Sequence, residues 1–263
     1  MDLGLKDRTV VVTGGSSGIG LAAVRAFLAE GARVAFCARG AERLEAAHDA
    51  LASEFGADRM LARAVSVLDK AAVAAFAEAV AARFGGCDAL VTNAGQGRVS
   101  TFADTGDEDW REELELKFFS QLYPIHAFEE MLRTSGAGAI VAVNSLLAYQ
   151  PEPHMVCTSA ARAGVQNLLK SLATELAPTI RVNSILLGLV DSNQWQRRFE
   201  ARADKGQSRE AWYDALARAK NIPLGRLGAP EEAARALVFL ASPAASYITG
   251  ARLEISGGVS RFA

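Results

Sequence analysis

Short apolar runs alternate with longer helical patterns along the whole sequence, and this alternation is what most limits the folds open to the chain. Runs of four to six residues rich in β-branched side chains are typical of buried strands, and the Ala-rich stretches between them have the length of helices. The expected strands are residues 9–13, 33–37, 60–65, 89–92, 139–144, 181–186 and 252–255. The expected helices include residues 19–30, 41–55 and 70–84. The alternation predicts an α/β fold with a doubly wound, seven-stranded parallel sheet and helices on both faces.

Composition indicates one domain and excludes several kinds of partner. A chain of 263 residues, 50% of them hydrophobic, can bury a substantial core. No linker or repeat divides residues 1–263, so we expect a single domain. The net charge of −2, without a long basic run, argues against nucleic acid or an anionic membrane as the main partner. The sequence shows neither a membrane-spanning apolar stretch nor the apolar core of a signal peptide.

The three cysteines indicate a reducing compartment. Cys37, Cys87 and Cys157 are odd in number and lack the spacing of metal ligands, which fits a cytoplasmic protein without a metal site. Cys37 ends one expected strand and Cys87 precedes another, so both are interpreted as small core residues. Cys157, beside Thr158, is interpreted as a small residue at the start of a helix, with a reactive thiol as the alternative.

Residues 192–221 are long for a connection, and such insertions in compact domains are commonly lids or binding loops. The segment contains Trp195, Arg197, Arg198, Phe199, Trp212 and Tyr213. This mixture predicts a helical flap over a medium-sized, partly aromatic or apolar ligand, and its arginines would tolerate a carboxylate or phosphoryl group. The alternative is a surface helical hairpin.

A glycine-rich turn joins the first expected strand to the first expected helix. It reads Gly14-Gly15-Ser16-Ser17-Gly18-Ile19-Gly20. Glycine suits this position because the chain turns tightly and a Cβ would keep a diphosphate away from backbone N–H groups. The N-terminus of the following helix adds partial positive charge. The turn therefore predicts a dinucleotide site.

The end of the second expected strand indicates which dinucleotide is bound. Folds that bind NAD usually carry an acidic residue there for the ribose hydroxyls, whereas this chain has Ala38 followed by Arg39. A guanidinium donates to a 2′-phosphate, which a carboxylate would repel. The sequence thus favours NADP(H) over NAD(H), with Arg39 as the determinant. The alternative is that Arg39 only solvates the strand end; Ser16 and Ser17 suit either cofactor.

These features, with Asn93-Ala94-Gly95, Asn144-Ser145 and Ser256-Gly257-Gly258, resemble the classical short-chain dehydrogenase/reductases over nearly the whole chain. The resemblance implies a Rossmann-type fold, a nicotinamide cofactor and an oxidoreductase activity on a small carbonyl or alcohol. It implies that the glycine-rich turn, Ile19 included, and Asn93, Ala94 and Gly95 line the nucleotide site, and that Ser145 orients the substrate. Residues 187–192 resemble the nicotinamide loop, so the resemblance assigns Gly188, Val190 and Ser192 to the cofactor.

The departures from the family pattern cluster at the chemistry. The family has a tyrosine thirteen residues after its serine and a lysine four residues further on; from Ser145 these positions fall on Thr158 and Arg162. Its helix asparagine, seven residues after a tryptophan, falls on Lys117. A threonine hydroxyl is a weaker and shorter-reaching acid than a phenol, and a guanidinium does not release its proton. The family's proton relay therefore cannot operate, although Arg162 keeps the charge to bind the nicotinamide ribose.

Three residues are candidates for the missing proton donor. Lys117 is favoured because a basic amine appears at one catalytic position while tyrosine and lysine vanish from two others, and a nearby Arg162 would lower its pKa. His154 comes second, since histidine titrates near neutral pH. Tyr149, on the same loop, comes third. The remaining alternative is that the chain has no acid.

The leading hypothesis is an NADP(H)-dependent carbonyl reductase or alcohol dehydrogenase with a non-standard proton donor. The rival is a redox-silent protein that binds a nucleotide or ligand as a sensor or assembly partner, and a weaker third is a lyase or isomerase using Lys117. The resemblance also implies a homo-oligomer, expected to be a tetramer, paired through helices at 107–133 and 158–177. The alternative is that the apolar stripe of the second helix only packs on the sheet.

Overall fold

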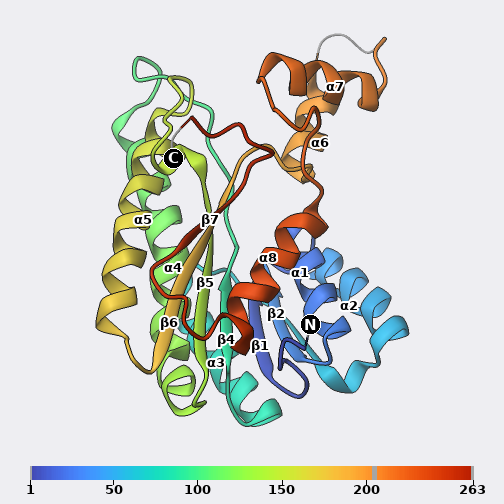
Figure 1. The fold of residues 1–263 in the computed structure, drawn as a ribbon, viewed down its shortest axis with the longest axis vertical. Helices are drawn as coiled ribbons and strands as arrows, with labels where there is room; N and C mark the ends of the chain where they lie inside the picture. Colours follow the sequence, from blue (N-terminus) through green and yellow to red (C-terminus); the bar gives the residue numbers. More distant parts are fainter. Residues whose placement is uncertain (1, 203–205, 262–263) are drawn as a thin grey trace.

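Seven parallel strands form one continuous sheet in the computed structural model, which describes residues 2–202 and 206–261 (Figure 1). The strands are β1 (Thr9–Thr13), β2 (Arg33–Ala38), β3 (Met60–Ala64), β4 (Ala89–Thr92), β5 (Gly138–Ser145), β6 (Ile180–Leu187) and β7 (Arg252–Ile255). Their order is β3-β2-β1-β4-β5-β6-β7, and every neighbouring pair is parallel. The predicted doubly wound sheet is confirmed. The order in which strands are added to the sheet reverses between β1 and β4, and doubly wound sheets bind ligands at this switch point.

Two layers of helices cover the sheet. One face packs against α1 (Gly18–Ala29), α2 (Ala41–Phe55) and α8 (Pro230–Ala241). The other face packs against α3 (Lys70–Phe84), α4 (Asp107–Thr134) and α5 (Val156–Glu175). Two more helices, α6 (Asn193–Ala201) and α7 (Arg209–Ala219), lie apart from these layers, at the upper right of Figure 1. Short 3₁₀ turns complete the described elements: η1 (Ala57–Arg59), η2 (Leu146–Ala148) and η3 (Pro243–Ala245).

Alternation along the central strands separates the two layers. Val10 and Val12 of β1 pack with Phe27 of α1, whereas Val11 belongs to the opposite cluster with Phe128 of α4. Successive strand residues point to opposite faces, so a strand covered on both sides is apolar along most of its length. All five residues of β1 are buried. This is why continuous apolar runs were a reliable signal for the strands.

The cysteines are buried, as interpreted from the sequence. Cys37 and Cys87 belong to the core beneath α3 and α4, and burial raises the pKa of the Cys37 thiol to about 12 and that of Cys87 as well. Cys157 is fully buried in the first turn of α5, with its sulfur 3.1 Å from the Ser100 hydroxyl. Its burial supports the small helix residue over the reactive thiol.

Most of the apolar stripe of α5 packs against the sheet. Of the five stripe residues, Val165, Leu169 and Leu176 are buried in the core with β5 and β6, and Leu172 packs against the same cluster. The fifth, Leu168, is half-buried and lies outside that cluster. This packing agrees with the alternative interpretation, in which the stripe packs on the sheet, and the stripe does not by itself indicate an interface between subunits. On α4, Leu114 and Phe119 remain 41% and 37% exposed. The homo-oligomer stays a prediction, with these two exposed side chains of α4 available to it.

A helix that spans a membrane is both long and apolar. Across the described ranges, no helix combines the length and the apolar character that crossing a bilayer requires.

Candidate active site

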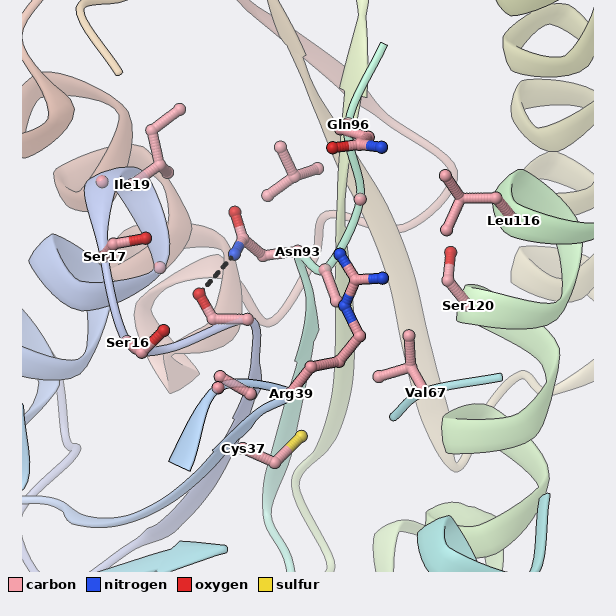
Figure 2. A pocket seen from close by; sticks show the side chains of 18 of the residues that line it. Ser16, Ser17, Ile19, Cys37, Arg39, Val67, Asn93, Gln96, Leu116 and Ser120 are labelled. Atoms are coloured by element: carbon pink, nitrogen blue, oxygen red, sulfur yellow. Dashed lines mark hydrogen bonds between the residues drawn. The ribbon is translucent and has the colours of Figure 1, made fainter. Parts of the chain in front are cut away.

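A cavity of about 700 Å³ opens at the carboxyl ends of β1 to β5 (Figure 2). Most of the residues assigned to the cofactor line it: Gly14, Ser16, Ser17, Gly18, Ile19, Gly20, Arg39, Asn93, Ala94, Gly95, Arg162 and Ser192. Gly188 and Val190, assigned to the same role, line a neighbouring cavity instead. Because most of these residues directly follow the ends of β1, β2 and β4, the sheet topology brings them together.

The glycine-rich turn is closed too tightly for side chains. A Cβ on Gly20 would lie 2.1 Å from the carbonyl oxygen of Gly14, and Gly14 itself has a φ of +72°. Asn93 braces the turn, since its Nδ2 donates to the carbonyl oxygens of Thr13 and Gly14 at 3.0 and 3.1 Å. The N-cap residue Ser17 makes no side-chain bond to α1, which leaves the first-turn N–H groups available to an anion.

Arg39 extends from the end of β2 across the cavity, between the glycine-rich turn and α4 (Figure 2). The strand ends at the uncharged Ala38, and the charged residue that follows it directly is Arg39; Glu42 and Arg43 line the same cavity. The arrangement at the carboxyl end of β2 is the one expected for a site that accepts a phosphate rather than a bare ribose.

A second cavity of about 560 Å³ adjoins the first, and Ile19, Gly97, Arg162, Leu187 and Ser192 line both. Ser145, Thr158 and His154 line the second cavity. The Ser145 hydroxyl donates to the carbonyl oxygen of Leu187 at 3.3 Å and accepts from the Leu147 N–H at 3.3 Å. These long bonds hold the hydroxyl at the end of β5 while leaving it exchangeable for a ligand.

Lys117 lines the first cavity, not the one that contains Ser145. It is 5% exposed; its Nζ lies 2.8 Å from Glu113 Oε1 and donates to the carbonyl oxygen of Gln96. Burial is the main cause that lowers the pKa of Lys117, from an ordinary 10.5 to about 8. The charge of Arg162 lowers it further, as expected from the sequence, and Glu113 opposes both. Lys117 is therefore a buried, ion-paired lysine rather than one that extends from the helix into solvent.

Glu113 is the site residue that sequence reasoning missed. It is 3% exposed, pairs with Lys117 one helical turn away, and accepts a hydrogen bond from the Thr158 hydroxyl. The spacing of four residues to Lys117 was visible in the sequence, but it is equally common on solvated helix surfaces. Only the packing of α4 against α5 shows that both charges point inward.

Thr158 is held in place by its neighbours. Its hydroxyl accepts the Arg98 N–H at 3.0 Å, lies 3.2 Å from the Arg98 carbonyl oxygen, and donates to Glu113. The residue is 1% exposed. These hydrogen bonds use the Thr158 hydroxyl to anchor the loop at Arg98 and to orient Glu113. Because its proton is already donated to Glu113, the arrangement agrees with the expectation that Thr158 is a poor substitute for a proton-donating phenol.

Arg162 lies on the wall shared by the two cavities. Its Nη1 donates to Asn144 Oδ1 at 3.1 Å and reaches the Val143 carbonyl oxygen at 3.5 Å. Among the described residues, nothing accepts a hydrogen bond from its buried Nε. Burial lowers the pKa of Arg162 to about 10, and Glu113 opposes this shift. Arg162 thus remains a cation with donor capacity to spare.

The other two acid candidates differ in position. His154 lines the second cavity half-exposed, with its Nδ1 3.8 Å from Glu152 Oε2. The Tyr149 hydroxyl donates to Glu254 of β7 instead, and Tyr149 lines neither cavity. Of the pair, only His154 is placed to meet a ligand beside Ser145.

The segment predicted as a flap is helical over its described residues, as α6 and α7; residues 203–205 lie outside them. Trp212 joins the two helices, with ring centroids 6.2 Å from Trp195 and 5.7 Å from Phe199. The Tyr213 hydroxyl donates to Asp191 at 2.7 Å, which ties α7 to the loop after β6. Trp195 lines the second cavity. The role of this segment as a lid stays a prediction.

Comparison with known proteins agrees with this architecture. A family model described as enoyl-(acyl carrier protein) reductase matches residues 14–260. A short-chain oxidoreductase of Pseudomonas aeruginosa PAO1, described as containing an atypical catalytic center, is 58% identical, with a TM-score of 0.95 over 99% of this chain and 100% of that one. The chain belongs to the short-chain dehydrogenase/reductase family.

Two further relatives cover the chain almost completely. The L-sorbose reductase of Gluconobacter frateurii, complexed with NADPH and L-sorbose, is 35% identical with a TM-score of 0.95 over 100% of both chains. The D-threitol dehydrogenase of Mycolicibacterium smegmatis is 36% identical over 98% of this chain and 94% of its own. The Pseudomonas protein also has an NADPH-bound structure, which matches at 58% identity with a TM-score of 0.93 over 99% of each chain. The recognised family and its Rossmann fold are confirmed.

Proposed function

We propose that this protein is an NADP(H)-dependent oxidoreductase that interconverts a small carbonyl compound and its alcohol, with a proton donor unlike the family's tyrosine. The observation that carries the proposal is the wall shared by the two cavities. Arg162, Leu187 and Ser192 border both, so a nicotinamide bound in the first cavity would meet a substrate held at Ser145 in the second. The NADPH-bound relatives support the cofactor.

The residues of the first cavity suit such a cofactor. Gly14 and Gly20 carry no side chain that would hold a diphosphate away from the backbone of the turn, and the N-terminus of α1 favours the diphosphate. Arg39 is positioned to bind a 2′-phosphate, and Arg162 to bind the nicotinamide ribose. Bound NADP(H) supplies or accepts the hydride; the protein supplies orientation and the proton.

The chain's own residues then divide the remaining work. Ser145 donates its hydroxyl proton as a hydrogen bond to the substrate oxygen, giving up its long bond to Leu187. Arg162 stabilises the negative charge that develops on that oxygen, and cannot itself give up a proton. Lys117 is the proposed proton source, because it lines the cofactor cavity with Arg162, which borders both cavities, and because its pKa of about 8 lies near working pH. Glu113 fixes the Lys117 ammonium beside Arg162.

Cofactor binding and turnover test the proposal together. We expect calorimetry to show tighter binding of NADPH than of NADH. Arg39→Ala should weaken NADPH about ten- to a hundredfold by removing charged hydrogen bonds, and leave NADH nearly unchanged. The matched control is Arg63→Ala, an exposed arginine on β3 that lines neither cavity. Equal affinity for both cofactors, or equal weakening of both, would contradict the assignment.

Turnover is measured as NADPH oxidation on a carbonyl panel. The panel includes L-sorbose, other ketoses, simple ketones and oxo acids, with the corresponding alcohols and NADP⁺ for the reverse direction. Tight NADPH binding without turnover on any compound would favour a redox-silent, ligand-sensing protein.

A further inference from the structure

Positive charge accumulates around the second cavity. Its charged wall residues are Arg162, Arg198, Lys220 and Arg261, with Glu152 as the acid and His154 beside it. The Glu152 carboxylate contacts two other residues of this wall: it lies 3.5 Å from Lys220 Nζ and 3.8 Å from His154 Nδ1. It therefore offsets Lys220, while Glu113 on α4 offsets Arg162 from outside the cavity. Among the acids that line the cavity in the described part of the chain, none pairs with Arg198.

Arg198 is held on the cavity wall by an aromatic ring. Its guanidinium carbon lies 4.6 Å from the ring centroid of Trp195, and both residues line the cavity. Stacking fixes the plane of a guanidinium while leaving its edge N–H groups free to bind a planar oxyanion in a bidentate manner. Partial burial lowers the pKa of Arg198 from its ordinary value, so the cation is less hydrated than a surface arginine.

The cofactor does not account for these cations. Arg39 and Arg197 line the first cavity, where the phosphates of a dinucleotide would lie. Arg198 follows Arg197 on α6 but lines only the second cavity. Adjacent residues of one helix thus serve different cavities, and Arg198 is available to a substrate.

We propose that the second cavity binds a carbonyl substrate that carries an oxyanion, a carboxylate or a phosphoryl group, and that Arg198 on Trp195 is its anion-binding residue. The inference rests on the proposed function and narrows its substrate class. The carbonyl oxygen lies at Ser145 and Arg162, and the anionic end of the same molecule lies toward α6. Uncharged relatives of the substrate enter the same cavity and bind more weakly.

The test compares probes matched in carbon skeleton but not in charge. The pairs are 4-oxopentanoate with 2-pentanone, and L-sorbose 1-phosphate with L-sorbose, each reduced with NADPH. We expect kcat/KM to be at least about tenfold higher for one or both anionic members, and the pair that shows the preference distinguishes carboxylate from phosphoryl. Screening of charges by salt should reduce that preference.

Variants of Arg198 separate binding from general damage. Arg198→Gln should raise KM for the preferred anionic probe about ten- to a hundredfold, with little change in kcat. The KM of the matched uncharged probe should change little. Arg198→Lys should recover part of the loss, because it restores charge without the bidentate edge. The control is Arg218→Gln, an exposed arginine on α7 that lines neither cavity.

The outcomes are distinguishable. Equal kcat/KM within both pairs, or an Arg198→Gln loss of the same size for charged and uncharged probes, overturns the anion-binding site while the proposed function stands. Failure to reduce any probe with NADPH bound overturns the proposed function and the site with it.

Discussion

Replacing Lys117 with methionine should flatten the pH dependence of stability above neutral pH. Burial and Arg162 hold the pKa of Lys117 at about 8 in the folded protein, against 10.5 when it is exposed. Between these values the unfolded chain binds more protons than the folded one, so the stability of the wild type rises with pH. Methionine has similar length and no charge, and the variant lacks this contribution.

The size of the effect follows from the two pKa values. Each pH unit inside the window changes the free energy of unfolding by at most ~1.4 kcal/mol. Integrated from pH 7 to 9.5, Lys117 should add about 2 kcal/mol to the wild type relative to the variant. The remaining titratable groups are common to both proteins, so the difference between the two pH profiles reports Lys117.

Urea denaturation followed by far-UV circular dichroism at pH 7, 8, 9 and 9.5, at one protein concentration, measures the difference. Lys70→Met is the matched control, because Lys70 is exposed at the start of α3 and should leave the pH dependence unchanged. The groups that face Lys117 are Glu113 on its own helix and Arg162 and Cys157 on α5. Identical pH profiles for wild type and Lys117→Met, or a wild type that loses stability relative to the variant as pH rises, would refute the reasoning.

Two further outcomes are expected. Lys117→Met should lower the rate of carbonyl reduction about 10²–10⁴-fold, the usual contribution of a general acid, whereas Thr158→Val should lower it much less. Steady-state kinetics of both variants measure the two rates. A larger loss in Thr158→Val than in Lys117→Met would contradict the role of Lys117 and favour another donor such as His154. Gly20→Ala should lower the unfolding free energy by about 1–3 kcal/mol and weaken NADPH, because its Cβ would lie 2.1 Å from the Gly14 oxygen. Gly86→Ala, with no atom within 4 Å of the added Cβ, is the control, and equal effects of the two alanines would contradict the steric argument.

Local patterns were sufficient for the sheet and for much of the nucleotide site. Strands buried on both faces are apolar along most of their length, so their runs could be located in the sequence to within a residue at either end. The glycine-rich turn and Arg39 could be assigned because their roles depend on backbone freedom and charge at a strand end, and both are properties of neighbouring residues. The spacing from Ser145 to Thr158 and Arg162 likewise needed no coordinates.

Only the tertiary structure decided what surrounds those residues. A glutamate four positions before a lysine is the same pattern on a solvated helix and on a buried one; the packing of α4 against α5 buries Glu113 and Lys117 and lowers the lysine pKa. Packing of α5 on the sheet assigns most of its apolar stripe to the core. Lys117 on α4 lines one cavity and Ser145 at the end of β5 lines the other. Burial depends on which surfaces meet, and those surfaces come from segments far apart in the chain.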